Sequence, residues 1–483
     1  MNLKNIIALS LLSIAQGDKL SHDINTLIKN TLNTDVVWDR LAEMTDTFGH
    51  RLVGSTNLEK SIDWVVDLVK SDGIDVRTEN VNVTYWQRLE EKAYLVSPTR
   101  GNVTIKVGAL GNSGSTPQGG VVAEVVPLHT FEQLDYLLSK DKDAIRGKIV
   151  LWNFNYTGYS SGKKFRNDGA PTALKHGALA SLIRSVTPFG LNNVHVGVQN
   201  GDYSIPSAAI TYEDAALLDR LYQRANNTRA INVLKKDQIS FPKIFLNIQT
   251  KKEPRVSRNV IAEIKGVEKP QEYVIVSGHI DSWDLGVGAL DDGAGALTSY
   301  EVLRQISKLK TKPKRTIQAI FWTSEETGGD GGDYHFQQRE HEFDNITFIM
   351  ESDFNTAKPD GFTFVGNDAQ KAFLKKIGDK YWKHRGLPTN FYEGNPGQDI
   401  LYICNQKKTP CAGYEAIIPL GNTYNNRTLA NPKTELVDGY WWYHHTDADR
   451  MEAIKPDQLS LSSAYMGSFI FAAAQNDIAL NKL

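Results

Sequence analysis

The stretch Tyr273-Val-Ile-Val-Ser-Gly-His279-Ile-Asp281 decides the fold, because it is an apolar run that stops at a histidine and an aspartate. A second apolar run, Thr316-Ile-Gln-Ala-Ile-Phe-Trp-Thr323, stops at Ser324-Glu325-Glu326. Between them, Gly288-Ala-Leu-Asp291-Asp292-Gly-Ala-Gly295 precedes a segment with helical apolar spacing. This order of strand, helix and strand predicts an open α/β sheet. Ligands of such sheets collect beyond the carboxyl ends of the strands.

The spacing of these polar residues has a chemical reason. Strand side chains alternate between faces, so His279 and Asp281 share one side. The aspartate can then accept the far imidazole N–H and leave the other nitrogen free for a metal. Asp291 stands at a helix start, where the helix dipole favours a carboxylate. Glu325 and Glu326 leave a strand as neighbours, so one can bind a metal while the other faces the attacking water.

Two further pieces follow the same pattern: Phe348-Ile-Met-Glu-Ser-Asp353, and His444-His445-Thr-Asp-Ala-Asp449 after an aromatic run. Each fragment alone has an ordinary explanation. Asp-Asp-Gly is a common turn, Glu-Glu at a strand end is commonly solvated, and Asp353 alone could cap a helix. Together the fragments supply histidines and carboxylates at successive strand ends, and this inventory suits two zinc ions that share a carboxylate.

This motif set resembles that of the dinuclear zinc exopeptidases, a family of aminopeptidases, glutamate carboxypeptidases and glutaminyl cyclases. The resemblance is to the glutamate carboxypeptidase type, and it runs from about Arg40 to near the C-terminus. It includes Ala178-Leu-Ala-Ser-Leu-Ile-Arg-Ser185 and Pro313-Lys-Arg-Thr316.

The resemblance implies a role for each residue. Asp291 would bridge two zinc ions. His279 and Asp353 would complete one metal site. Glu326 and His445 would complete the other. Glu325 would be the general base, with Asp281 behind His279 and Asp449 supporting His445.

The fold expected from the family is an α/β, phosphorylase/hydrolase-like zinc peptidase sheet flanked by helices. The catalytic domain would comprise residues 34–112 and 253–483. Residues 113–252 would form an inserted, protease-associated-like β-rich domain, entered through the glycine-rich run 111–120. Within it, Gly158-Tyr-Ser160-Ser-Gly162 matches the nucleophile-elbow pattern. The polar residues that follow favour a flexible turn instead. Tyr440-Trp-Trp-Tyr443 is interpreted as a buried strand, with a pocket wall as the alternative.

The N-terminus has the pattern of a signal peptide at residues 1–17: a lysine, a short apolar core and small residues. That core is too short to span a membrane, which needs roughly 20 residues. Residues 18–33 are a pro-segment or a first helix. We therefore expect a protein of the secretory pathway, secreted or lysosomal. Glycosylation sequons agree with this, and they stand at Asn82, Asn102, Asn155, Asn226, Asn345 and Asn426.

Charge and cysteine content exclude other classes. The net charge of -2 indicates no nucleic-acid surface. Two cysteines, Cys404 and Cys411, cannot form a disulfide scaffold. They form either one short-loop bridge or a pair of buried thiols.

By resemblance, the function is that of a zinc-dependent exopeptidase that hydrolyses dipeptides or short peptides with free termini, as a carboxypeptidase or dipeptidase. An aminopeptidase is the alternative, because the same metal core serves both ends of a peptide. A glutaminyl cyclase uses one zinc ion and fits the complete ligand set less well. A receptor-like binding protein on an inactive peptidase fold is the hypothesis from another class. The resemblance also implies a homodimer.

Overall fold

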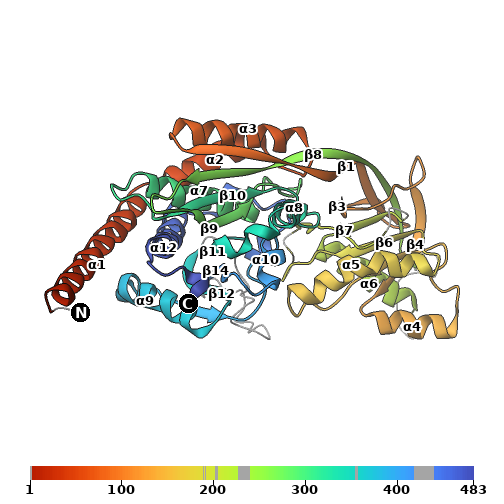
Figure 1. The fold of residues 1–483 in the computed structure, drawn as a ribbon. Helices are drawn as coiled ribbons and strands as arrows, with labels where there is room; N and C mark the ends of the chain where they lie inside the picture. Colours follow the sequence, from red (N-terminus) through yellow and green to blue (C-terminus); the bar gives the residue numbers. More distant parts are fainter. Residues whose placement is uncertain are drawn as a thin grey trace.

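The structure is a computed structural model. It describes residues 3–188, 190, 192–201, 205–226, 240–353, 357–417 and 440–483, with side chains from residue 18 onward except at position 417. One mixed sheet runs along the molecule, with helices packed against it (Figure 1). The α/β class predicted from the sequence is confirmed.

From one edge of the sheet to the other, the hydrogen-bonded neighbours are β13 (Asn390–Tyr392), β12 (Lys358–Val365), β14 (Cys411–Ile417), β11 (Ile346–Glu351), β9 (Lys269–His279), β10 (Arg315–Trp322), β8 (Lys243–Ile264), β4 (Val121–Leu128), β5 (Ile149–Trp152), β6 (Ala180–Arg184), β7 (Ser207–Ile210) and β3 (Val107–Ala109). Two further strands stand outside this order: β1 (Asp75–Ser97) pairs with β8 and with β2 (Gly101–Ile105). The principal helices are α1 (Leu3–Leu32), α2 (Val36–Phe48), α3 (Thr56–Ser71), α4 (Phe131–Lys140), α5 (Tyr159–Lys175), α6 (Tyr212–Asn226), α7 (Ala294–Ser307), α8 (Asp330–Gln337), α9 (Asp368–Tyr381), α10 (Leu401–Asn405), α11 (Tyr440–Tyr443) and α12 (Pro456–Gln475).

The strands that carry the predicted site are central and parallel. β9 pairs in parallel with both β10 and β11, and β11 pairs in parallel with β14. Every residue of β10 and β11 is buried. Their sequences are nearly continuous apolar runs because helices cover both faces of a parallel sheet. α7 makes the crossover between β9 and β10, so the carboxyl ends of these strands meet at one edge.

A long antiparallel ribbon joins the two ends of the molecule. β1 pairs with β8 from Asp75 opposite Glu263 to Val96 opposite Lys243. The second half of β8 lies beside β10, and its first half lies beside β4. Figure 1 shows this ribbon passing from the central strands to the end that carries α4, α5 and α6. The strands predicted in the segment 113–252 therefore extend the same sheet as β4, β5, β6 and β7.

Two local predictions are wrong. The segment after Gly158 is not a flexible turn, because it forms helix α5. Its buried face is made of Gly162, Arg166, Gly169, Ala170 and Ala173, which have helical spacing but little apolar character. The aromatic run 440–443 is not a strand, because it forms the short helix α11.

The first helix belongs to the core. Residues 18–32 form the second half of α1, and Ile24, Leu27 and Ile28 are at most 1% exposed. Leu27 packs closely against Gly467 of α12. In Figure 1 the N-terminal end of α1 projects beyond the helices that surround its other end. Met1, Asn2 and the side chains through Gly17, on which the signal-peptide prediction rests, lie outside the described residues.

The remaining chain-wide predictions concern processing. Cys404 and Cys411 are joined by a disulfide, so the bridge is found and not a pair of thiols. The sequon asparagines Asn82, Asn102, Asn155 and Asn226 are exposed. Asn426 lies outside the described residues. In the described part of the chain, no helix combines the length and apolar character needed to cross a membrane.

We expect Leu27→Ala to lower the free energy of unfolding by about 2–5 kcal/mol, because it leaves a cavity beneath α12. The control is His22→Ala on the exposed face of the same helix, which should change stability by less than about 0.5 kcal/mol. Chemical denaturation measures both. Equal stability of the two variants would show that α1 is not part of the folded core.

Candidate metal centre

The five predicted ligands come from strand ends and loops at one edge of the sheet. His279 is the last residue of β9, Glu326 follows β10, and Asp353 follows β11. Asp291 lies in the turn between β9 and α7, in the segment Ala289–Gly293, where its own backbone is not helical (φ -118°, ψ 95°). His445 follows α11. The parallel register brings these ends together, as the sequence predicts.

The ligands form two groups that share Asp291. In the first, Nε2 of His279 lies 3.3 Å from Oδ1 of Asp353 and 3.6 Å from Oδ1 of Asp291. In the second, Nε2 of His445 lies 2.8 Å from Oε2 of Glu326 and 3.4 Å from Oδ2 of Asp291. Asp291 thus directs one carboxylate oxygen to each group. The hydroxyl of Tyr440 donates a hydrogen bond of 2.9 Å to its Oδ1.

The residues present fit divalent cations. Among the described residues, Nε2 of His279 and Oε1 of Glu326 are buried and have no hydrogen-bond partner. Burial, and then the Asp291 carboxylate, raises the pKa of Glu326 well above its usual value. Burial lowers the pKa of His445 to about 3, so this imidazole is neutral and can offer a lone pair. The neutral imidazole of His445 and the crowded carboxylates are donors that zinc accepts.

Glu325, the predicted base, lies at the rim of this cluster. Its Oε2 is 3.9 Å from Nε2 of His279. Burial raises the pKa of the Glu325 carboxyl to about 8, and the Asp353 and Asp281 carboxylates add to the effect. A carboxyl group with this pKa can both take up and release a proton near neutral pH.

Asp281 supports the site in two ways. Nδ1 of His279 lies 3.0 Å from the carbonyl oxygen of Asp281 and 3.6 Å from its carboxylate. The carboxylate accepts the backbone N–H groups of Glu325 and Glu326, at 3.2 and 3.3 Å. The sequence predicts that the carboxylate itself accepts the imidazole N–H, whereas the shorter contact is to the carbonyl. The carboxylate is directed instead to the end of β10.

Asp449 supports Asp291 instead of His445. Its carboxylate accepts the backbone N–H groups of Leu290 and Asp291, at 2.7 and 3.1 Å. Nδ1 of His445 lies 3.0 Å from the carbonyl oxygen of Val196. The N–H on this nitrogen therefore points to a carbonyl of the segment 113–252, and Nε2 is left for a metal. The backbone N–H of Val196 donates in return to the carbonyl of His445 at 3.0 Å.

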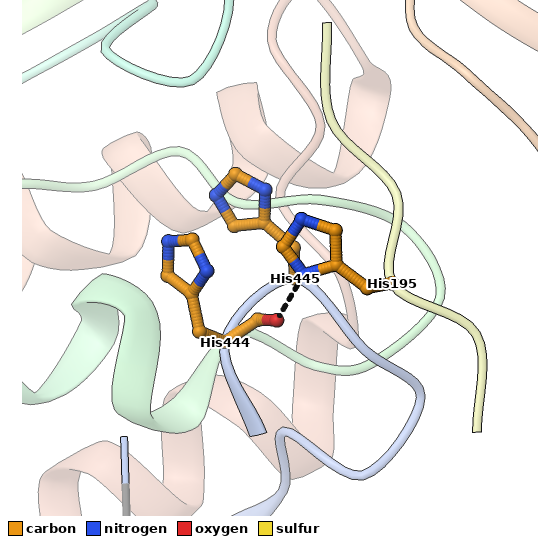
Figure 2. Close-up of side chains that lie close together, drawn as sticks. All are labelled: His195, His444 and His445. Carbon is orange, nitrogen blue, oxygen red and sulfur yellow. Dashed lines mark hydrogen bonds between the residues drawn. The ribbon is translucent and has the colours of Figure 1, made fainter. Parts of the chain in front are cut away.

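Three histidines gather around this contact, and no sequence motif singles out His195 as one of them. Figure 2 shows the rings of His195, His444 and His445 side by side, with a hydrogen bond between Nδ1 of His195 and the backbone oxygen of His444. Nη1 of Arg166 donates to Nε2 of His195 at 2.9 Å. This guanidinium would repel a cation, so we interpret the three rings as a hydrogen-bonded support. No local signal connects His195 to His444, because their contact is a long-range pairing.

Arg51 holds the loop between β9 and Asp291. It is fully buried, and its guanidinium donates to the carbonyl oxygens of Ile280, Val287 and Gly288 at 2.6–2.7 Å. No local sequence pattern indicates this role, because the partners of Arg51 lie at least 229 residues further along the chain. An arginine here also brings a positive charge close to the acidic cluster.

A cavity of about 220 Å³ lies near the candidate metal centre, although none of the proposed ligands lines it. Trp86, Trp283 and Val198 form apolar parts of its wall, and Thr327 is the residue after Glu326. Trp283 also lines a small pocket with Asp291, Glu326 and His445.

Comparison with known proteins agrees with this geometry. Residues 259–470 match the model of peptidase family M28. Carboxypeptidase Q of Mus musculus is 34% identical over 445 residues, which cover 91% of this chain and 86% of that protein. Carboxypeptidase Q of Bos taurus is 36% identical, over 88% of this chain and 83% of that protein.

Solved structures show the same fold. A peptidase M28 precursor from Shewanella amazonensis aligns with a TM-score of 0.81 at 26% identity, over 95% of this chain and 98% of that one. A zinc aminopeptidase from Bacillus subtilis aligns with a TM-score of 0.65 at 17% identity, over 92% of this chain and 97% of that one. The second likeness concerns the fold alone. The sequence identity to the two carboxypeptidases, over most of both chains, shows that this chain belongs to peptidase family M28.

Proposed function

We propose that this protein is a secreted or lysosomal exopeptidase that uses two zinc ions to hydrolyse dipeptides or short peptides with free termini, as a carboxypeptidase or dipeptidase. The proposal includes a signal peptide at residues 1–17, an insert at 113–252 within the catalytic domain, and a homodimer. His279, Asp291 and Asp353 would hold one ion. Glu326 and His445 would hold the other together with Asp291.

The observation that carries the proposal is the place of Glu325. It lies beside a cluster of buried proposed ligands, and its Oε2 is 3.9 Å from Nε2 of His279. Zinc, when bound, would supply Lewis-acid polarisation of the scissile carbonyl and of the attacking water. The identity to carboxypeptidases over about nine-tenths of the chain supports the same reaction class.

The residues of the chain have distinct tasks in this reaction. Glu325 accepts the proton of the attacking water and then delivers it to the leaving amine. Asp281 fixes the backbone of Glu325 through its carboxylate and the ring of His279 through its carbonyl. Asp449 holds the backbone of Asp291. These fixed positions let the proton transfer occur without a rearrangement of the site.

An aminopeptidase remains the second candidate, because the fold is also that of a zinc aminopeptidase. A receptor-like binding protein is the alternative outside enzymes. A zinc count combined with a panel of dipeptides with free or blocked termini separates these functions. A carboxypeptidase or dipeptidase requires a free C-terminus, and an aminopeptidase requires a free N-terminus. A binding protein cleaves none of the peptides.

Glu325→Gln should lower kcat by about 10²–10⁴-fold, because glutamine cannot accept the proton of the attacking water. Zinc content should stay at the wild-type value, since the proposed ligands are intact. Steady-state kinetics and atomic absorption measure the two quantities. Wild-type turnover of this variant would exclude Glu325 as the base.

Asp281→Asn should weaken metal affinity or activity by about 10- to 100-fold, because the charged acceptor of two backbone N–H groups is lost. Asp330→Asn is the matched control. That carboxylate accepts a hydrogen bond from Ser324 in the same turn but contacts none of the proposed ligands. Competition with a chelator measures zinc affinity in both variants. If both variants retained wild-type affinity, Asp281 would have no supporting role.

Zinc should dissociate as the pH falls, because protons compete with the metal for the ligands. Burial would lower the pKa of His279, but the Asp281, Asp291 and Asp353 carboxylates raise it well above its usual value. The metal-free centre therefore binds a proton readily, and metal binding must release it, so affinity decreases on acidification. Dialysis at stepwise lower pH followed by metal analysis measures the loss. Constant zinc content down to strongly acid pH would contradict the ligand assignment.

A further inference from the structure

Three basic side chains lie beside the acidic centre, and they differ in what they contact. Arg51 is fully buried and donates to three backbone carbonyls. Arg166 is 3% exposed and donates to His195 and to the hydroxyl of Tyr159. Lys163 is exposed, and within the described residues its ammonium makes no hydrogen bond or ion pair. Lys163 is therefore the cation of the three that can take a ligand.

Lys163 lies at the end of an aromatic wall. Its Nζ lies 5.8 Å from the centre of the Tyr159 ring, one turn earlier on α5. Tyr159 stacks on Trp441 at 4.4 Å and meets the ring of His444 edge-on at 4.9 Å. His444 in turn stacks on His445, a proposed metal ligand, at 3.7 Å. The wall therefore reaches from the metal centre to the ammonium of Lys163.

The acidic centre acts on Lys163 through its charge. Burial, and then Arg166, lowers the pKa of Lys163, while the Glu325, Asp353 and Glu326 carboxylates act in the opposite direction. Bound divalent cations would take up the charge of these carboxylates. The ammonium of Lys163 would then have no anionic neighbour among them, and the site would favour an anionic ligand there.

Tyr159 adds a hydrogen-bond donor at the same place. Its hydroxyl oxygen accepts from Nη1 of Arg166 at 3.1 Å, so its own O–H is available to donate. Burial raises the pKa of Tyr159 to about 12, which keeps the phenol protonated. The side chain is half-buried, so a ligand at the metal centre can reach it.

We infer that the ammonium of Lys163 and the hydroxyl of Tyr159 bind the C-terminal carboxylate of the substrate. This inference rests on the proposed peptidase function and specifies which end of the peptide the site recognises. A carboxylate satisfies both donors with charge-assisted hydrogen bonds. An N-terminal ammonium in the same position would be repelled by Lys163. The site therefore selects for a free C-terminus.

Lys163→Met tests the inference, because methionine keeps much of the length of the side chain and removes the charge. The substrates are a panel of dipeptides, each with a free C-terminal carboxylate or a C-terminal amide. For the carboxylate form we expect KM to rise roughly 10- to 100-fold, the value of a hydrogen bond to a charged group, with kcat retained. For the amide form, KM should rise far less. Lys163→Arg should retain most of the preference, and Tyr159→Phe should show a smaller loss in the same direction.

Lys164→Met is the matched control. Lys164 is the next residue of α5, but its Nζ lies 5.3 Å from the centre of the Phe131 ring, away from the aromatic wall. This variant should keep the wild-type ratio between carboxylate and amide substrates. If both lysine variants lost this preference equally, the effect would come from the overall positive charge of α5, and the inference would be wrong.

A binding measurement separates this inference from the proposed function. Calorimetry measures the affinity of zinc-loaded wild-type and Lys163→Met protein for two ligands. The first is the amino acid that the best panel substrate would release, and the second is the amide of that amino acid. The wild type should bind the acid more tightly than the amide, and the variant should lose this difference. If the variant keeps the wild-type acid-to-amide ratio, the inference is wrong. If no dipeptide is hydrolysed, the proposed function is wrong. The inference can still be tested in that case, because the affinities of the panel's C-terminal amino acids and of their amides can be compared between the wild type and the variant.

Discussion

The structure depends on the burial of several carboxylates close to one another. Asp281, Asp291 and Glu326 are each at most 6% exposed at the carboxyl edge of the sheet, and Glu325 lies beside them. Removing a charged group from water is costly unless it is paired or bound to a metal. The fold offsets part of this cost with backbone N–H groups directed at Asp281 and Asp449. The remaining charge is what a pair of divalent cations would neutralise.

The sequence predicted the convergence of the ligands because it follows from the topology. Parallel strands joined by a crossover helix end at the same edge, so polar residues at the ends of β9, β10 and β11 must approach one another. The supporting contacts were less predictable. The acceptor of the His279 ring N–H and the true partner of Asp449 depend on loop paths between Asp281 and Asp291. Alternation along a strand does not determine those paths.

The contributions of the segment 113–252 could not be predicted from local pattern. Val196 and His195 meet residues 444–446 through a pairing between distant parts of the chain. Helix α5 was misinterpreted because its buried face consists of glycine, alanine and Arg166. Such a face can bury because small residues allow close packing, with Gly169 against Trp152 and Gly162 against Phe154. Apolar periodicity, the usual signal of a helix, is weak in this case.

These contacts restrict how a substrate can reach the centre. Val196 and His445 exchange backbone and side-chain hydrogen bonds. The continuous ribbon of β1 and β8 ties together the same two parts of the molecule. Separating these parts would break the support of a proposed metal ligand, so a substrate must reach the centre while the two parts stay joined. The contacts that hold His445 in place therefore also limit how far the two parts can separate.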